Sequence, residues 1–190
     1  MKTGEVKHIK TAKRYSNAIF KLALESGLLD KIYNDLIFIQ QTISSNPQLK
    51  MFLLNPVISK EDKKDVISKI FSVHTDKIAY DFLYLLADNG RIDILNEVLN
   101  QFTKKYNEEN NIIKPQIISA VELNEIQKDK LKEKLEKKLS KKVVPEYLIN
   151  ADIIGGLIVE IDDKTIDCSL KTKFYNMKQQ LTKGSRYGSD

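Results

Sequence analysis

The sequence predicts a multidomain chain of the α and α+β classes, in which an N-terminal six-helix bundle precedes a small C-terminal α/β domain with a β-hairpin. In the first part, apolar side chains recur at helical spacing from residue 11 to about residue 110. After a polar run at residues 108–111, β-branched residues become frequent and strand-like runs alternate with helical ones. We therefore expect one domain over residues 1–110, a second over residues 111–182, and a disordered tail over residues 183–190.

The composition is that of a globular protein with a mixed surface. Hydrophobic residues make up 42% and charged residues 30% of the 190 residues, and 31 basic side chains are interspersed with 26 acidic ones. This mixture indicates a solvated surface and not a nucleic-acid-binding arm. The single cysteine, Cys168, can form neither an intramolecular disulfide nor a cysteine-based zinc site, which fits a reducing compartment.

No apolar run approaches the roughly 20 residues that span a bilayer. The N-terminus matches neither a secretory signal nor an organelle transit peptide. We therefore expect a soluble protein of the bacterial cytoplasm that reaches a membrane only through its partners.

Turn residues divide the first part into six predicted helices. The first carries an apolar stripe and ends at Gly27, which favours a left-handed stop. Ser59 followed by Asp62 predicts a capping box at the start of the fourth helix, and Thr75 is the expected cap of the fifth. The stripe of the first helix consists of Ala12, Tyr15, Ile19, Leu22 and Ala23. The other predicted breaks lie at Asn46-Pro47, Asn55-Pro56 and Asn89-Gly90.

The second part is predicted to alternate strands and helices. Strands are expected at residues 112–123 and 143–149, with a lysine-rich helix at residues 124–142 between them. A β-hairpin over residues 157–166 turns at residues 162–164. The final helix carries on one face Leu170, Phe174, Met177 and Leu181.

The side chains that could carry out chemistry do not form a set. His8 lies in a predicted disordered start and His74 in a loop, so we interpret both as surface histidines. Cys168 opens the last predicted helix and could be a reactive thiol, although a half-buried structural cysteine is the favoured interpretation. Gly155-Gly156 leads into a strand and lacks the lysine and helix of a phosphate-binding loop, which favours a backbone role. We therefore expect no catalytic residues, no cofactor and no metal.

The lysine-rich helix at residues 124–142 leaves an alternative function open. Its basic face could contact RNA, an acidic partner or a membrane surface, which would make the chain a nucleic-acid-binding or general protein–protein adaptor. Four acidic residues and the lack of aromatic residues on this helix argue against nucleic acid. A solvated face is the favoured interpretation.

Three segments carry a specific combination of residues. They are A-K-R-Y-S-N-A-I at residues 12–19, L-Y-L-L-A-D-N-G-R at residues 83–91 and I-G-G-L-I-V-E-I-D-D at residues 154–163. In this order and spacing they resemble the delta subunits of bacterial F-type ATP synthase, a family called the oligomycin-sensitivity-conferring protein in mitochondria. The resemblance covers about residues 11–182. Two turns depart from the family pattern, at Asp162-Asp163 and at Asp167-Cys168-Ser169.

The resemblance implies a non-catalytic subunit of the peripheral stalk, or stator, of proton-translocating F-type ATP synthase. The N-terminal domain would sit on the catalytic head and bind the N-terminal helix of an alpha subunit. The C-terminal domain would bind the b subunits, so that the stalk resists rotor torque during ATP synthesis. The protein would then lie at the cytoplasmic face of the bacterial inner membrane, as a peripheral protein that binds no nucleic acid.

Helical spacing, together with the family's groove between the first and fifth helices, suggests where the alpha-subunit helix binds. The hypothesis assigns to this groove Tyr15, Ile19, Leu22, Phe82, Leu83 and Leu86. The alternative is that these side chains fill the core of the bundle, which is the usual place of apolar stripes. Contact with the b subunits is assigned to the lysine-rich helix and the final helix.

Overall fold

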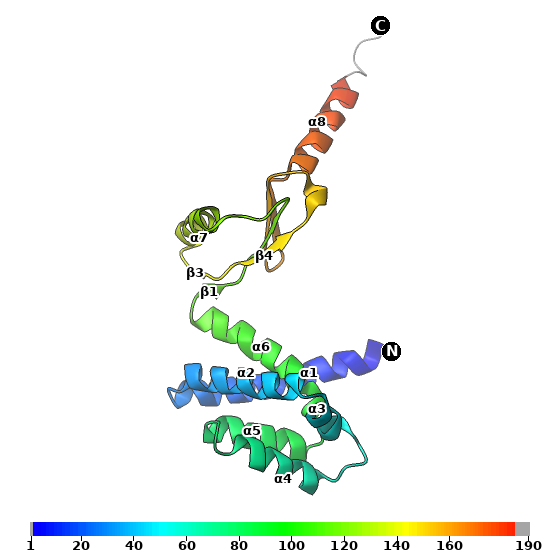
Figure 1. Cartoon of the computed structure of the whole chain (residues 1–190), viewed down its shortest axis with the longest axis vertical. Helices are drawn as coiled ribbons and strands as arrows, with labels where there is room; N and C mark the ends of the chain where they lie inside the picture. The colour runs from blue at the N-terminus through cyan, green and yellow to red at the C-terminus, as the bar shows by residue number, and fades with distance from the viewer. Residues whose placement is uncertain (1, 185–190) are drawn as a thin grey trace. The chain divides into compact units, whose positions relative to one another are not determined.

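The chain forms two compact units, Met1–Asn107 and Glu108–Asp190, which we call the N-terminal unit and the C-terminal unit. A computed structural model describes the backbone of residues 2–184 and the side chains of residues 8–182 (Figure 1). The chain is mostly helical with an α/β region at its C-terminal end, as the sequence predicts. The helices of the first part are α1 (Lys2–Glu25), α2 (Leu29–Ser45), α3 (Pro47–Leu54), α4 (Lys60–Phe71), α5 (Lys77–Asp88), the short 3-10 helix η1 (Ile92–Ile94) and α6 (Leu95–Glu109).

The helices of the N-terminal unit surround one continuous core. Helix α1 contacts α2, α5 and η1, whereas α4 and α5 lie side by side (Figure 1). Aromatic rings join three helices, because Phe20 meets the edge of Phe102 at a centroid distance of 5.4 Å and Tyr33 stacks on Tyr106 at 4.0 Å. The largest fully buried side chains of this core are Ile32, Leu36, Ile39, Leu53, Ile67, Phe71, Leu83, Leu86, Val98 and Phe102.

Most of the predicted helix signals of this unit are confirmed. Gly27 and Gly90 follow α1 and α5 with φ of +67° and +63°, the left-handed geometry that glycine adopts at little cost. Ser59 caps α4, since its hydroxyl oxygen accepts from the Asp62 N–H at 3.1 Å. The predicted disordered start is wrong, because α1 begins at Lys2. Extending an existing helix costs far less than nucleating one, so its first turns need no apolar stripe.

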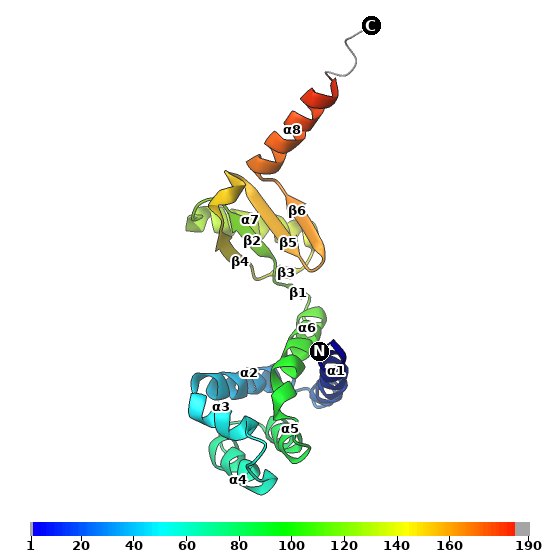
Figure 2. The ribbon, with the colours of Figure 1, turned by 90° about the vertical axis from the view of Figure 1, so that its right-hand side faces the viewer.

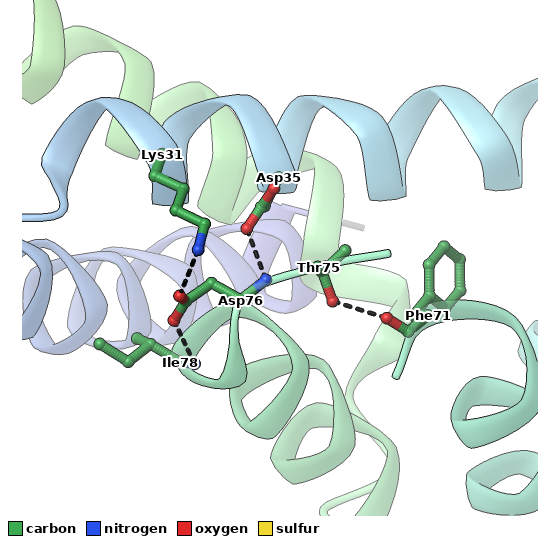
Figure 3. A network of polar contacts seen from close by, with 6 residues as sticks. All are labelled: Lys31, Asp35, Phe71, Thr75, Asp76 and Ile78. Atoms are coloured by element: carbon green, nitrogen blue, oxygen red, sulfur yellow. Dashed lines mark hydrogen bonds and ion pairs between the residues drawn. The ribbon is translucent and has the colours of Figure 1, made fainter. Parts of the chain in front are cut away.

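The cap of α5 is Asp76 and not Thr75, which corrects the prediction by one residue. The Asp76 carboxylate accepts from the Ile78 N–H at 3.0 Å and from the Lys31 ammonium of α2 at 2.9 Å (Figure 3). The Thr75 hydroxyl instead donates to the Phe71 carbonyl oxygen at 2.8 Å. The bond from Lys31, followed by that from the Ile78 N–H, lowers the pKa of the Asp76 carboxyl. The residue that caps α5 is therefore the one whose carboxylate also binds Lys31 on α2.

The C-terminal unit is built on a four-stranded sheet of order β4-β2-β5-β6, with a short parallel pair β1-β3 beside it. Helix α7 covers one face of the sheet (Figure 2). The elements are β1 (Ile112–Ile113), β2 (Gln116–Ser119), α7 (Glu125–Leu139), β3 (Lys142–Val143), β4 (Glu146–Ile149), the 3-10 helix η2 (Ala151–Ile153), β5 (Leu157–Ile161), β6 (Lys164–Asp167) and α8 (Leu170–Gly184).

Prolines split two of the predicted strands. Pro115 separates β1 from β2, and Pro145 separates β3 from β4, so neither predicted strand is continuous. The two prolines fall at the same level of a parallel ladder, because Gln116 pairs with Glu146 directly after them. Proline has no N–H to donate and therefore interrupts a ladder.

Helix α7 uses its apolar stripe inside the unit. Leu135 is buried against the sheet, and Leu131 and Leu139 pack beside it. The helix begins with a capping box of Asn124 and Gln127. It ends at Leu139, three residues before the predicted end, because the next residue has left-handed geometry.

The glycine pair leads into the predicted hairpin and has the predicted backbone role. Gly156 has a φ of +81°, and a Cβ at this position would clash with the carbonyl oxygen of Cys168. Strands β5 and β6 pair antiparallel, with Asp162 at a φ of +50° in the turn between them. Aspartate tolerates this geometry better than most residues, so the departure from a glycine-containing turn leaves the hairpin intact.

Candidate partner-binding site

An apolar groove lies between α1 and α5 of the N-terminal unit. Its volume is about 450 Å³. Its lining includes the ring of Tyr15, which meets the ring of Phe82 edge-on at a centroid distance of 6.3 Å. Such ring contacts fix the relative position of the two helices. The lining residues are Thr11, Arg14, Tyr15 and Ala18 of α1, Phe82 and Leu85 of α5, and Arg91 just after it.

Three of the six predicted groove residues, Tyr15, Phe82 and Leu22, lie in the groove lining or beside it on α1. Tyr15 and Phe82 line the groove itself, and Phe82, at 8% exposed, also belongs to the core of the unit. Leu22 is 49% exposed and lies one helical turn beyond Ala18, so it extends the exposed apolar face of α1. The structure thus places an apolar strip along α1 beside the groove.

The other three predicted residues lie beneath the groove. Ile19, Leu83 and Leu86 are at most 3% exposed and belong to the core of the unit. They support the two helices without reaching the surface of the groove. That a partner helix binds in the groove stays a prediction.

Leu85 is the large apolar groove residue that the sequence prediction missed, together with the small Ala18. It is 47% exposed and lines the groove, whereas its neighbour Leu86 is fully buried. All five residues at 82–86 are aromatic or leucine, so apolar periodicity cannot decide which of them faces the core. Packing against α1 and α4 decides it.

The basic groups of the groove were also missed. The Arg91 guanidinium lies over the Tyr15 ring at 5.7 Å from its centroid, a cation–π arrangement. Arg14 lines the same groove from α1. Nearby, His8 Nδ1 of α1 lies 3.3 Å from the Asp93 carboxylate, with both side chains largely exposed. His8 is therefore a surface histidine, although it lies in a helix and not in a disordered start.

A second exposed apolar surface lies on α8 of the C-terminal unit. Five of its side chains are between 39% and 74% exposed, which is unusual for a stripe at helical spacing. The helix carries lysines and no acidic residue between Leu170 and Gly184. The last two residues of α8, 183 and 184, belong to the predicted tail, and the rest of that tail, 185–190, lies outside the described residues. The exposed apolar side chains are Leu170, Phe174, Tyr175, Met177 and Leu181.

The remaining candidates for chemistry are dispersed. His74 is exposed in the loop after α4. Cys168 is exposed and precedes α8, so the favoured interpretation of a half-buried cysteine is wrong. The buried residue at this junction is the neighbouring Ser169, whose Oγ accepts from the Thr172 N–H at 3.2 Å. Within the described part of the chain, no three His, Cys, Asp or Glu side chains gather as metal ligands, and no helix has the length and apolarity to cross a membrane.

Comparisons with known proteins agree on one family. The family model described as ATP synthase delta (OSCP) subunit matches residues 11–181. The chain is 35% identical over 174 residues to ATP synthase subunit delta of Halothermothrix orenii, which covers 92% of this chain and 91% of that protein. It is 35% identical over 176 residues to ATP synthase subunit delta of Carboxydothermus hydrogenoformans, over 93% and 99% of the two chains. A chain of the Toxoplasma gondii mitochondrial ATP synthase hexamer has the same fold, with a TM-score of 0.72 at 19% identity over 90% of this chain and 97% of that one.

Proposed function

The chain belongs to the ATP synthase delta (OSCP) subunit family, whose members are non-catalytic structural subunits of F-type ATP synthase, and we propose that it is the upper joint of the stator. In this proposal residues 1–110 bind the N-terminal helix of an alpha subunit on the catalytic head. Residues 111–182 bind the b subunits. The joint resists rotor torque during proton-driven ATP synthesis, at the cytoplasmic face of the bacterial inner membrane.

The observation that carries this proposal is the apolar groove between α1 and α5. Leu85 is exposed in its lining and Leu22 is exposed beside it, whereas Ile19, Leu83 and Leu86 of the same two helices are buried in the core. A rigid floor with exposed apolar side chains suits an amphipathic helix, because affinity in such grooves comes from a few apolar anchors. Since the floor is already packed, binding needs little rearrangement of the free protein.

Peptide binding tests the alpha-subunit contact. The full chain is titrated with a synthetic peptide of the N-terminal helix of the alpha subunit encoded by the same genome. Leu85→Asp places a charge in the groove lining, and Leu22→Asp places one on the exposed apolar face of α1 beside the groove. Neither side chain belongs to the core, and each variant should weaken binding at least about tenfold. Val73→Asp, at an 85% exposed position outside the groove lining, is the matched control and should bind like the parent. Unchanged affinity in both groove variants would refute the placement.

Exposed side chains on α8 support the contact with the b subunits. The apolar stripe of α7 packs against the sheet, whereas Phe174 and Met177 of α8 are 56% and 57% exposed. We therefore assign the contact to α8 more than to the lysine-rich helix α7. The double variant Phe174→Asp/Met177→Asp should lose co-purification with the b subunits while binding of the alpha peptide remains. Asn176→Asp, on the same helix, should retain both interactions. Retention of the b subunits by the double variant would contradict this assignment.

A further inference from the structure

Arginine is rare in this chain, and its placement is not random. Only three of the 31 basic residues are arginines, at positions 14, 91 and 186. Two of the three, Arg14 and Arg91, line the groove between α1 and α5 although they are 77 positions apart in the sequence. A chain that uses lysine almost everywhere else thus brings two guanidinium groups to one surface. Arginine differs from lysine in its planar fork, which matches a carboxylate with two parallel hydrogen bonds.

These two guanidinium groups have no acidic partner among the side chains that the structure describes. No ion pair of residues 8–182 includes Arg14 or Arg91, and no acidic residue lines the groove. The nearest acidic group along the chain, Asp93, lies against His8 at 3.3 Å. The Tyr15 ring supports Arg91 from one face and leaves its N–H groups for another acceptor. The groove is therefore an apolar strip lined by two arginines that form no ion pair among the described side chains, although Asp93 and Arg91 both line the neighbouring pocket.

We propose that Arg14 and Arg91 bind a carboxylate on the partner helix and so fix its register and direction in the groove. The inference rests on the proposed function and adds the chemistry of the partner: an amphipathic helix whose apolar stripe is flanked by an acidic residue. Apolar contacts over Tyr15, Phe82 and Leu85 supply most of the affinity but tolerate sliding by one turn. A bidentate pair between an arginine and a carboxylate does not tolerate such sliding, because the planar guanidinium must meet the carboxylate in its plane.

Charge reversal in the full chain tests this proposal. Arg14→Glu and Arg91→Glu are titrated with the alpha-subunit N-terminal peptide at low and at moderate salt. Each should raise Kd at least about tenfold, the change expected on losing a charge-assisted hydrogen bond. Lys13→Glu is the matched control, since it makes the same change of charge on α1 outside the groove lining and should change Kd less than about threefold. The attraction that salt screens should be lost in the double variant Arg14→Glu/Arg91→Glu, so added salt should weaken its binding less than that of the parent.

A rescue experiment separates a specific pair from a general charge effect. In a set of peptides, each acidic residue is replaced singly by lysine. One replacement should restore binding to Arg91→Glu or Arg14→Glu while it weakens binding to the parent. A merely structural role of the arginines would give no such rescue.

The outcomes distinguish the inference from the function on which it rests. If Arg14→Glu, Arg91→Glu and Lys13→Glu all bind like the parent while Leu85→Asp does not, the groove is the binding site and the carboxylate inference is wrong. If no single peptide replacement rescues either variant, the specific pair is likewise refuted. If the parent chain does not bind the peptide at all, the proposed function of the groove fails, and the inference fails with it.

Discussion

The two units of the molecule are stabilised in different ways. The N-terminal unit buries the apolar faces of its helices in one large core, which includes five side chains of α5 alone. In the C-terminal unit the described core cluster holds four buried apolar side chains, Ile117, Leu135, Val143 and Val159. None of the exposed apolar side chains of α8 belongs to that core cluster. A small core contributes little free energy through apolar burial. Hydrogen bonds between strands and residues with positive φ therefore contribute a larger part of the stability of the C-terminal unit.

The difference in core size bears on how each unit would bind its partner. A unit with a large core can present a fixed surface, and the groove between α1 and α5 lies directly on fully buried residues. A unit with a small core and an exposed stripe gains stability when a partner covers that stripe. In the proposed stator, the first unit would be a preformed receptor, whereas the second would be completed by the partner that it binds.

The largest expected loss of stability comes from a substitution in the core of the N-terminal unit. Leu83→Ala removes a fully buried side chain and should lower the free energy of unfolding by about 2–5 kcal/mol, because the cavity cannot collapse fully. Urea unfolding followed by circular dichroism measures it. Leu85→Ala, two residues on and 47% exposed, is the control and should cost less than about 1 kcal/mol. Equal losses of unfolding free energy in the two variants would contradict the orientation of α5, in which Leu83 faces the core and Leu85 does not.

The next effect tests how far the C-terminal unit depends on backbone geometry. Gly156→Ala should destabilise this unit by about 2 kcal/mol or more, since a positive φ is costly for alanine and its Cβ would meet backbone. Gly155→Ala is the matched control, because its Cβ would meet only the flexible end of the Leu170 side chain, 2.8 Å from Cδ1. Amide hydrogen exchange of residues 157–167 reports the loss of protection. A greater loss in Gly155→Ala than in Gly156→Ala would contradict the described geometry.

A smaller effect tests the polar link between α2 and the start of α5. Asp76 N–H donates to Asp35 at 2.7 Å, and the Asp76 carboxylate binds Lys31 and caps α5 (Figure 3). Asp76→Ala should cost about 1–2 kcal/mol at pH 7, mainly through loss of the cap. A Thr75→Ala variant should cost less, because Thr75 is not the cap.

The same residue gives a defined pH dependence. The folded pKa of Asp76 is lowered, so its stabilisation is fully present above the ordinary aspartate pKa of about 3.9 and is lost as the pH falls through the folded pKa. The difference in unfolding free energy between the parent and Asp76→Ala should therefore shrink in acid. Denaturant titrations at several pH values measure this difference, and a constant difference would exclude the charged network.

The smallest effect concerns Tyr106, whose hydroxyl donates to the Asp30 carboxylate at 2.7 Å. This bond raises the pKa of Tyr106 to about 12. Its stabilisation is present below the ordinary tyrosine pKa of about 10 and is lost as the pH rises through about 12. Tyr106→Phe should cost about 1 kcal/mol at pH 7 and remove the highest-pH step of the tyrosinate absorbance titration. Persistence of that step in Tyr106→Phe would assign it to another tyrosine.

Local signals in the sequence were reliable where a residue acts through its own backbone. Gly27 and Gly90 end helices, Ser59 caps one, and Gly156 precedes the hairpin, because each effect depends on the φ and ψ of one residue or on a bond to a near neighbour. Prolines are equally informative about where strands end. Pro115 and Pro145 each interrupt a strand that apolar content alone made continuous.

The sequence by itself determined the two-part organisation, most helix ends, the hairpin and the family, because periodicity, turn residues and three motifs are local properties of the chain. Only the tertiary structure decided which leucines of α5 face the groove, which residue caps that helix and which apolar stripes stay exposed. Each of these choices depends on a partner from a distant segment: α1 beside Leu85, Lys31 beside Asp76, the sheet beneath α7. The groove, with Arg14 and Arg91 at its edge, exists only where residues far apart in the sequence pack together.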